Sequence, residues 1–264
     1  MFAFVKLFNF SLFCRTSKSS SVYYILSAHG LGADGICLAP FCKELSSDGE
    51  TTFFFTQGSV QCDPPPGFQD YFGPGPHYRF VDYDGIQEND VLERVRDFPE
   101  GENPEDVMRE LLPAGEEGVL SSVRTALDII YRTLDEHGPF DGICAYSEGT
   151  VMGGSLILDE LRRFETEGRP RQIKMAVFFA GWPPLKPDSD EVLLVDTSED
   201  FIDVPTLHCI GASDPYVHGA RALFDVCDPD SAILFDHGKG HTIPRDAQTL
   251  RELSDAVRGV YPGA

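Results

Sequence analysis

The residues that could carry chemistry lie near the middle of the chain, where an apolar run ends in Ala145-Tyr146-Ser147-Glu148-Gly149. A small residue two places before a serine and a glycine two places after it are typical of a sharp turn from a strand into a helix. Such a turn holds the serine hydroxyl above a sheet, where it can act as a nucleophile. Glycine is usual at the first position, and Ala145 adds a methyl group where the turn is crowded. A buried strand before any polar helix start would look similar, so the prediction needs partner residues.

A serine nucleophile requires a histidine that takes its proton and a carboxylate that orients the histidine. The candidates for the base are His237 and His241, and we favour His241 because the apolar Ile243 can fix the loop just after it. The candidates for the acid are Asp214, directly beyond an apolar run, and Asp203 in an acidic segment. Asp214 is better placed, although an aspartate before a proline is also common as a simple turn residue. In chain order the serine then precedes the acid, and the acid precedes the base.

An attacked carbonyl develops negative charge on its oxygen, and two fixed N–H groups are needed to stabilise that charge. We expect one from Glu148, directly after the nucleophile, and one from Leu31 or its neighbour in a glycine-rich loop. His29, at the start of that loop, is expected to support it. The carboxylate of Glu148 would disfavour the anionic intermediate if it pointed inward, and would favour the helix start if it pointed to solvent.

Apolar runs that alternate with amphipathic runs predict the elements that position these residues. Such strands, apolar on both faces, indicate an α/β fold with a mostly parallel, doubly wound sheet covered on both sides. The carboxyl ends of its strands, where such sheets hold their active sites, would bring the candidate residues together. We expect strands at 22–28, 51–56, 140–145, 174–181, 206–211 and 232–235, and helices at 36–45, 121–137, 148–164, 220–226 and 245–260.

The chain changes character at about residues 61–113, where proline, glycine and aromatic residues are frequent. Long segments without regular structure are usually functional or disordered. We predict a lid-like insertion whose aromatic side chains form a pocket wall, and the alternative is a surface loop folded on its own side chains. Residues 21–264 are expected to form a single domain. Residues 1–20 are expected to be a poorly ordered extension, such as a wrongly assigned start would leave, with a transit peptide as the alternative.

The composition argues against several classes of function. A formal net charge of −22 opposes binding to nucleic acids and to anionic membrane surfaces. No apolar run approaches the roughly 18 residues of a membrane-spanning helix. The seven cysteines lack metal-binding spacing, so we expect no metal, no organic cofactor, and reduced thiols in the cytoplasm.

Several short segments of this chain occur together in one known family. They are His29-Gly30, Tyr78-Arg79-Phe80, the serine turn, residues 206–214 and residues 240–244. Together they resemble the fungal family of serine hydrolases, which includes the thioesterase of the lovastatin pathway. The resemblance covers the chain from about residue 22 to its end. It implies an α/β-hydrolase fold and a catalytic triad of Ser147, Asp214 and His241.

The resemblance also implies a function and shows where this chain departs from the family. The usual turn is Gly-Phe-Ser-Gln-Gly, so Ala145, Tyr146 and Glu148 differ from it. The implied activity is hydrolysis of an acyl ester or thioester, with release of a polyketide-type chain from an acyl carrier domain in secondary metabolism. The alternatives are an esterase of small free esters and a ligand-binding protein without chemistry.

A carrier domain is typically acidic, so its docking on this acidic chain would need a local basic patch. The candidates for that patch follow the helix after the serine turn, and a solvated helix end is the simpler interpretation of them. They are Arg162, Arg163, Arg169 and Arg171.

Overall fold

The computed structural model describes residues 23–29, 37–62, 76–82, 98–99, 101–112, 117–187, 189 and 191–261. Its centre is a six-stranded sheet in the order β2-β1-β5-β6-β7-β8, in which every pairing is parallel. The strands are β1 (Tyr23–His29), β2 (Thr51–Thr56), β5 (Gly142–Tyr146), β6 (Ala176–Phe179), β7 (Thr206–Ile210) and β8 (Ala232–Asp236). The strand order reverses between β1 and β5, so the serine turn after β5 lies at the switch point of a doubly wound sheet.

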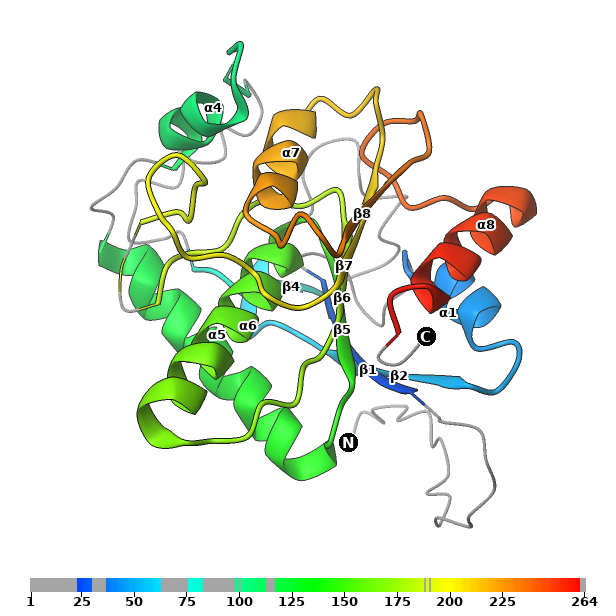
Figure 1. Cartoon of the computed structure of the whole chain (residues 1–264), viewed down its shortest axis with the longest axis horizontal. Helices are drawn as coiled ribbons and strands as arrows, with labels where there is room; N and C mark the ends of the chain where they lie inside the picture. Colours follow the sequence, from blue (N-terminus) through cyan, green and yellow to red (C-terminus); the bar gives the residue numbers. More distant parts are fainter. Residues whose placement is uncertain are drawn as a thin grey trace.

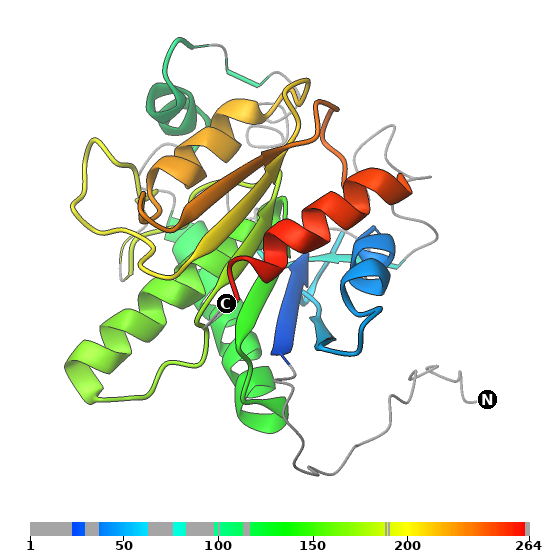
Figure 2. The ribbon, with the colours of Figure 1, turned by 45° about the vertical axis from the view of Figure 1, so that its right-hand side comes forward.

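Helices cover both faces of this sheet (Figures 1 and 2). The helices α5 (Glu117–His137), α6 (Glu148–Glu167) and α7 (Val217–Asp225) lie on one face, and α1 (Ala39–Leu45) and α8 (Ala247–Arg258) lie on the other. Successive residues of β5 point to opposite faces, because side chains alternate along a strand. Ile143 therefore belongs to the apolar cluster under α5 and α6, and Cys144 to the cluster under α1 and α8.

The expected elements agree with the structure apart from their ends and one strand. The helix α6 continues to Glu167 and ends at Gly168, which adopts a left-handed conformation with φ of 69°. The strand β8 was expected to be covered on both faces, but Ile233 and Leu234 are 39% and 49% exposed. The reason is its position, since β8 is the last strand at one edge of the sheet.

The segment at 61–113 contains regular elements that its composition did not indicate. A short antiparallel pair joins β3 (Val60–Cys62) to β4 (His77–Arg79), and α4 spans Pro104–Leu111. Asn103 caps α4, because its side chain accepts a hydrogen bond from the N–H of Asp106 at 2.9 Å. Most of the predicted lid, including Phe68, lies outside the described residues, and so do residues 1–20.

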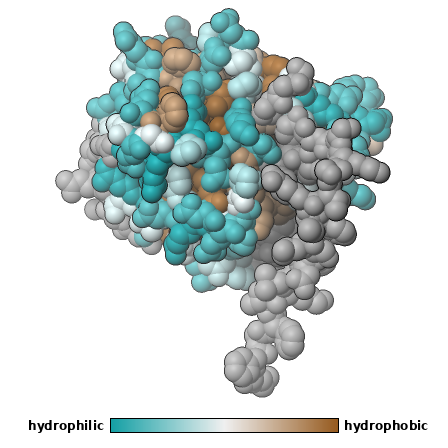
Figure 3. Space-filling view, turned by 60° about the horizontal axis from the view of Figure 1, so that its bottom comes forward, coloured by the Kyte–Doolittle hydropathy of each residue, from teal (hydrophilic) through white to brown (hydrophobic). Residues whose placement is uncertain are grey.

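The surface shown in Figure 3 is mainly hydrophilic, and its hydrophobic residues form small separate areas. No helix in the described ranges is long and apolar enough to cross a membrane.

Candidate active site

Three side chains from distant parts of the chain form one continuous line of hydrogen bonds. The Nε2 atom of His241 lies 3.1 Å from Oγ of Ser147, and its Nδ1 lies 2.8 Å from Oδ2 of Asp214. The side chains of His241 and Asp214 are 10% and 2% exposed. A buried carboxylate next to Nδ1 favours the tautomer with hydrogen on Nδ1, which leaves Nε2 free to accept the serine proton.

The backbone at Ser147 has the strained geometry that the turn sequence predicts. Its φ of 54° and ψ of −126° are unfavourable for a residue with a side chain. The hydroxyl of Thr150 donates to the carbonyl oxygen of Ser147 at 2.8 Å and holds the turn in place. The methyl group of Ala145 fits because it faces Gly153 of α6, where an added Cβ would lie only 3.3 Å from it. The absence of a glycine at position 145 is thus compensated by Gly153, which lies about one helix turn after Gly149 on α6.

The loops that carry the acid and the base are bonded to one another. Asp214 follows β7 and His241 follows β8, and the two strands are neighbours. The N–H of Ser213 donates to the carbonyl oxygen of Lys239 at 3.1 Å, which joins the two loops. Gly211 permits this approach, since a Cβ there would overlap the same carbonyl oxygen.

Neighbouring residues fix both the backbone and the ring of His241. The hydroxyl of Tyr146 donates to the carbonyl oxygen of His241 at 3.2 Å, and the nearby Ile243 is buried in the core. The ring of Tyr216 meets the imidazole edge-to-face, with 4.9 Å between ring centres. The Tyr216 N–H donates to the second oxygen of Asp214 at 2.8 Å, so the same residue also fixes the acid.

The two alternative candidates are engaged elsewhere. The Nδ1 atom of His237 accepts a hydrogen bond from the N–H of Lys239 at 3.3 Å, and burial lowers the pKa of His237. Asp203 forms a two-pronged ion pair with Arg171, with both N–O distances at 2.6 Å. Asp203 is therefore engaged with Arg171. In the structure His241 contacts Ser147, and Asp214 contacts His241.

An aromatic cluster beside the histidine was not foreseen from the sequence. The ring of Tyr216 lies 5.1 Å from that of Phe98 and 6.3 Å from that of Trp182. Burial, with a smaller effect of Asp214, raises the pKa of Tyr216, so its phenol stays neutral. Trp182 follows β6 and Tyr216 follows β7, so their positions beyond strand ends were the available signal. Phe98 belongs to the segment expected to form a pocket wall.

The two residues predicted for the oxyanion differ in what the structure shows. Leu31 lies outside the described residues. Glu148 begins α6 directly after the serine. Its carboxylate points neither to the serine nor to bulk solvent: its two oxygens accept the N–H groups of Phe80 and Val81, at 3.2 and 3.3 Å. The side chain thereby ties the start of α6 to the chain just after β4.

We expect Glu148→Gln to loosen this connection, because an amide has one acceptor oxygen and would turn its NH2 group toward the second N–H donor. Loss of one hydrogen bond to a charged acceptor should lower the free energy of unfolding by about 1.5–3 kcal/mol. Hydrogen exchange at Phe80 and Val81 should become faster. Glu165→Gln, on an exposed part of the same helix, is the matched control. Equal exchange in both variants would show that the Glu148 contact does not hold this segment.

Comparison with known proteins places this chain in a family. A model of the family described as "Serine hydrolase (FSH1)" matches residues 25–253. The chain belongs to this family. It is a serine hydrolase of the esterase type.

Two relatives show how far the similarity extends along the chain. The chain is 29% identical over 243 residues to "Hydrolase phiM" of Talaromyces stipitatus, which covers 87% of this chain and 84% of that protein. It is 25% identical over 242 residues to "Esterase FUS5" of Gibberella fujikuroi, which covers 90% of this chain and 86% of that protein. The similarity therefore extends over most of both chains.

Solved structures establish the same fold at low sequence identity. The carboxylesterase of Bacillus cereus matches with a TM-score of 0.51 and 15% identity over 92% of this chain and 91% of its own. A carboxylesterase from Mesorhizobium loti matches with a TM-score of 0.52 and 15% identity, over 90% and 88% of the two chains. The fold of this serine hydrolase is the α/β-hydrolase fold.

Proposed function

We propose that Ser147, His241 and Asp214 are the catalytic triad of an esterase or thioesterase. The observation that supports this proposal is the line of contacts from Asp214 through His241 to Ser147, at 2.8 and 3.1 Å. His241 takes the proton from Oγ of Ser147 through Nε2 while Oγ bonds to the acyl carbon. Asp214 holds the Nδ1–H and stabilises the imidazolium that forms.

The rest of the cycle follows from the same three groups. The protonated His241 gives its proton to the departing alcohol or thiol, and an acyl group remains on Ser147. His241 then takes a proton from water, the hydroxide attacks the acyl carbon, and the acid leaves as the proton returns to Ser147. No step needs a metal ion or an organic cofactor. Among the residues that the structure describes, no cluster of three or more potential ligands could hold a metal ion.

The anionic intermediates of this cycle need two N–H donors. We assign one to the amide of Glu148, which follows the nucleophile at the start of α6. We assign the other to Leu31 or its neighbour, because the loop after β1 follows a strand that pairs directly with β5. Fixing Glu148 through its side chain keeps its amide oriented toward the acyl oxygen.

The acyl group that enters this site is apolar. Support for this assignment comes from Phe98, Trp182 and Tyr216, whose rings contact one another beside the imidazole of His241. Aromatic rings bury large apolar areas, so a wall of three favours longer or aromatic acyl chains over acetyl.

We expect Tyr216→Ala to reduce kcat/KM for an octanoyl ester about tenfold more than for an acetyl ester. Loss of roughly 1.4 kcal/mol of apolar contact corresponds to that factor. The N–H that binds Asp214 is a backbone group and remains in the variant. Tyr216→Phe keeps the ring and serves as the control. An equal loss for both esters would mean that Tyr216 acts by orienting His241 and does not contact the acyl chain.

A narrower form of this proposal is that the enzyme acts in the cytoplasm and releases a polyketide-type chain from an acyl carrier domain. The arginines considered for docking are largely occupied within the chain. Arg162 and Arg163 both bind Asp159 at 2.6 Å, and Arg171 binds Asp203. These ion pairs favour the alternative of small free esters and thioesters as substrates.

Comparison of one acyl group on a carrier domain and on a short thiol distinguishes the two substrate classes. A carrier-bound substrate hydrolysed at least tenfold faster, with a rate that falls as salt rises, would support release from a carrier. Equal rates at all salt concentrations would favour free thioesters.

A further inference from the structure

One threonine hydroxyl connects the turn of the nucleophile to the aromatic cluster beside His241. Thr150 follows Ser147 by three residues on α6 and is fully buried. Its Oγ1 lies 2.8 Å from the carbonyl oxygen of Ser147, 3.0 Å from the carbonyl oxygen of Trp182 and 2.8 Å from the backbone nitrogen of Trp182. The backbone of Trp182 is therefore bonded to the same atom that holds the backbone of Ser147.

The groups bonded to this hydroxyl differ in how much they depend on it. A hydroxyl has one hydrogen to donate and two lone pairs. The N–H of Trp182 donates to Oγ1, and the carbonyl oxygens of Ser147 and Trp182 share the hydroxyl hydrogen. The Ser147 carbonyl also accepts the N–H of Thr150 at 2.9 Å, whereas among the described residues the Trp182 carbonyl has no other donor. Loss of the hydroxyl would leave both backbone groups of Trp182 unpaired in a buried place, which is unfavourable.

The chain between β6 and Trp182 is strained, so it needs a support of this kind. Ala180 has a φ of 43°, which is unfavourable for a residue with a side chain. The next residue, Gly181, lies so close to Thr150 that an added Cβ would be 2.1 Å from Oγ1. A strained conformation persists only where its surroundings hold it. The hydroxyl of Thr150 provides that support two residues after Ala180.

The position of the Trp182 ring is set by this backbone and by α7. The ring packs against Gly219, where an added Cβ would lie 2.3 Å from a ring carbon. Its centre lies 6.3 Å from the ring centres of both Phe98 and Tyr216, and Tyr216 in turn contacts the imidazole of His241. Movement of the Trp182 backbone would therefore move one wall of the proposed acyl site relative to the nucleophile.

We propose that Thr150 is a positioning residue that sets the selectivity of the enzyme for long acyl chains. Its hydroxyl keeps the wall that binds the acyl chain and the serine that attacks the acyl carbon at one spacing. Reacting atoms must meet at about 3–3.5 Å, and a misplacement of about 1 Å can lower the rate roughly 100-fold. An acetyl group is too short to contact the wall, so its hydrolysis depends less on that spacing. This inference rests on the proposed triad and on the proposed apolar acyl group.

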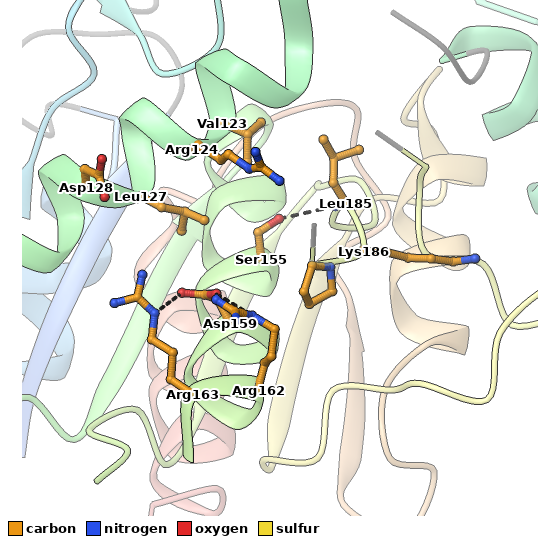
Figure 4. A pocket seen from close by; sticks show the side chains of 11 residues that line it. Val123, Arg124, Leu127, Asp128, Ser155, Asp159, Arg162, Arg163, Leu185 and Lys186 are labelled. Atoms are coloured by element: carbon orange, nitrogen blue, oxygen red, sulfur yellow. Dashed lines mark hydrogen bonds and ion pairs between the residues drawn. The ribbon is translucent and has the colours of Figure 1, made fainter. Parts of the chain in front are cut away.

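A second hydroxyl of α6 binds the same segment of chain at a distance from the nucleophile. The N–H of Leu185 donates to Oγ of the buried Ser155 at 3.2 Å (Figure 4). Ser155 is eight residues beyond Ser147, which is roughly 12 Å at the rise of an α-helix. It lines a cavity of about 260 Å³ between α5, α6 and residues 185–187, and none of the triad residues lines that cavity. Ser155→Ala is therefore the matched control for loss of the Thr150 hydroxyl.

The experiment measures kcat/KM of the full-length chain for an octanoyl and an acetyl ester of the same alcohol. Thr150→Val removes the hydroxyl at nearly constant volume, and Thr150→Ser keeps the hydroxyl. We expect the octanoyl-to-acetyl ratio of kcat/KM to fall at least tenfold in Thr150→Val and to stay within threefold of the wild type in Thr150→Ser. The ratio should stay within twofold in Ser155→Ala. Circular dichroism checks that each variant is folded.

Trp182 is the single tryptophan of the chain, so its fluorescence reports the position of the wall without any turnover. The emission maximum should shift in Thr150→Val, because the indole ring changes its packing on α7. It should not shift in Thr150→Ser or in Ser155→Ala. An unchanged emission spectrum of folded Thr150→Val would overturn the proposal.

Three kinetic outcomes would also contradict it. They are an unchanged ratio in Thr150→Val, an equal loss for both esters, which would mean that Thr150 only holds the nucleophile turn, and a fall in Ser155→Ala as large as in Thr150→Val. If Thr150→Val does not fold, Trp182→Phe tests the same step, and an unchanged ratio there would overturn the proposal because the ring would not bind the acyl chain. A wild-type chain that hydrolyses neither ester and is not labelled by a fluorophosphonate would instead contradict the proposed triad.

Discussion

Replacement of Ser147 by alanine should reduce kcat for ester hydrolysis by roughly 10^5–10^6-fold, because removal of a serine nucleophile leaves only the oxyanion donors and substrate binding. Labelling by a fluorophosphonate should disappear as well, since the reagent needs an activated hydroxyl. The substitution removes one oxygen at a half-buried position, so the protein should stay folded. Its circular dichroism and melting temperature should remain close to those of the wild type.

Ser121→Ala provides the control for this experiment, because Ser121 is an exposed residue of α5. The control should keep full activity and full labelling. A folded wild-type chain that is not labelled at all would contradict the proposed triad. It would draw attention to Ala145 and Glu148, two of the three positions that differ from the usual turn, and would favour a ligand-binding role.

Replacement of Asp214 by asparagine should reduce kcat on the order of 10^4-fold with little change in KM. Asparagine can still accept the N–H of Tyr216, but its NH2 group would face Nδ1 of His241 and favour the wrong tautomer. The rate of fluorophosphonate labelling should fall in parallel, because His241 would no longer take the serine proton. Steady-state kinetics and the labelling rate measure the two effects separately.

Asp203→Asn is the matched control, since Asp203 is the other carboxylate that the sequence leaves open. Asp203 forms an ion pair with Arg171, and within the described part of the chain it makes no contact with His241. This variant should keep kcat within threefold of the wild type. Loss of activity in Asp203→Asn together with normal activity in Asp214→Asn would reverse the assignment of the acid.

The segment at 61–113 shows where composition misleads. Proline and glycine are frequent there, yet β4 and α4 form. The local pattern of proline and glycine residues does not reveal that His77–Arg79 pairs with Val60–Cys62 as an antiparallel strand. The amides that follow β4 are bound by Glu148, which is 68 residues from Phe80 in the chain. A contact over such a separation depends on how the elements pack, and no local pattern encodes it.

The sequence by itself determined the residue types, their order and the kind of sheet that carries them. Apolar runs and turn residues are local signals, so the strand before Ser147 and the helix after it could be predicted. Tertiary structure decided which side chains meet. It brings Asp214 and Ser147 to His241 across 27 and 94 residues, and it selects His241 over His237. The physical reason is that the direction of a side chain depends on the packing of strands and helices far apart in the chain, which periodicity does not record.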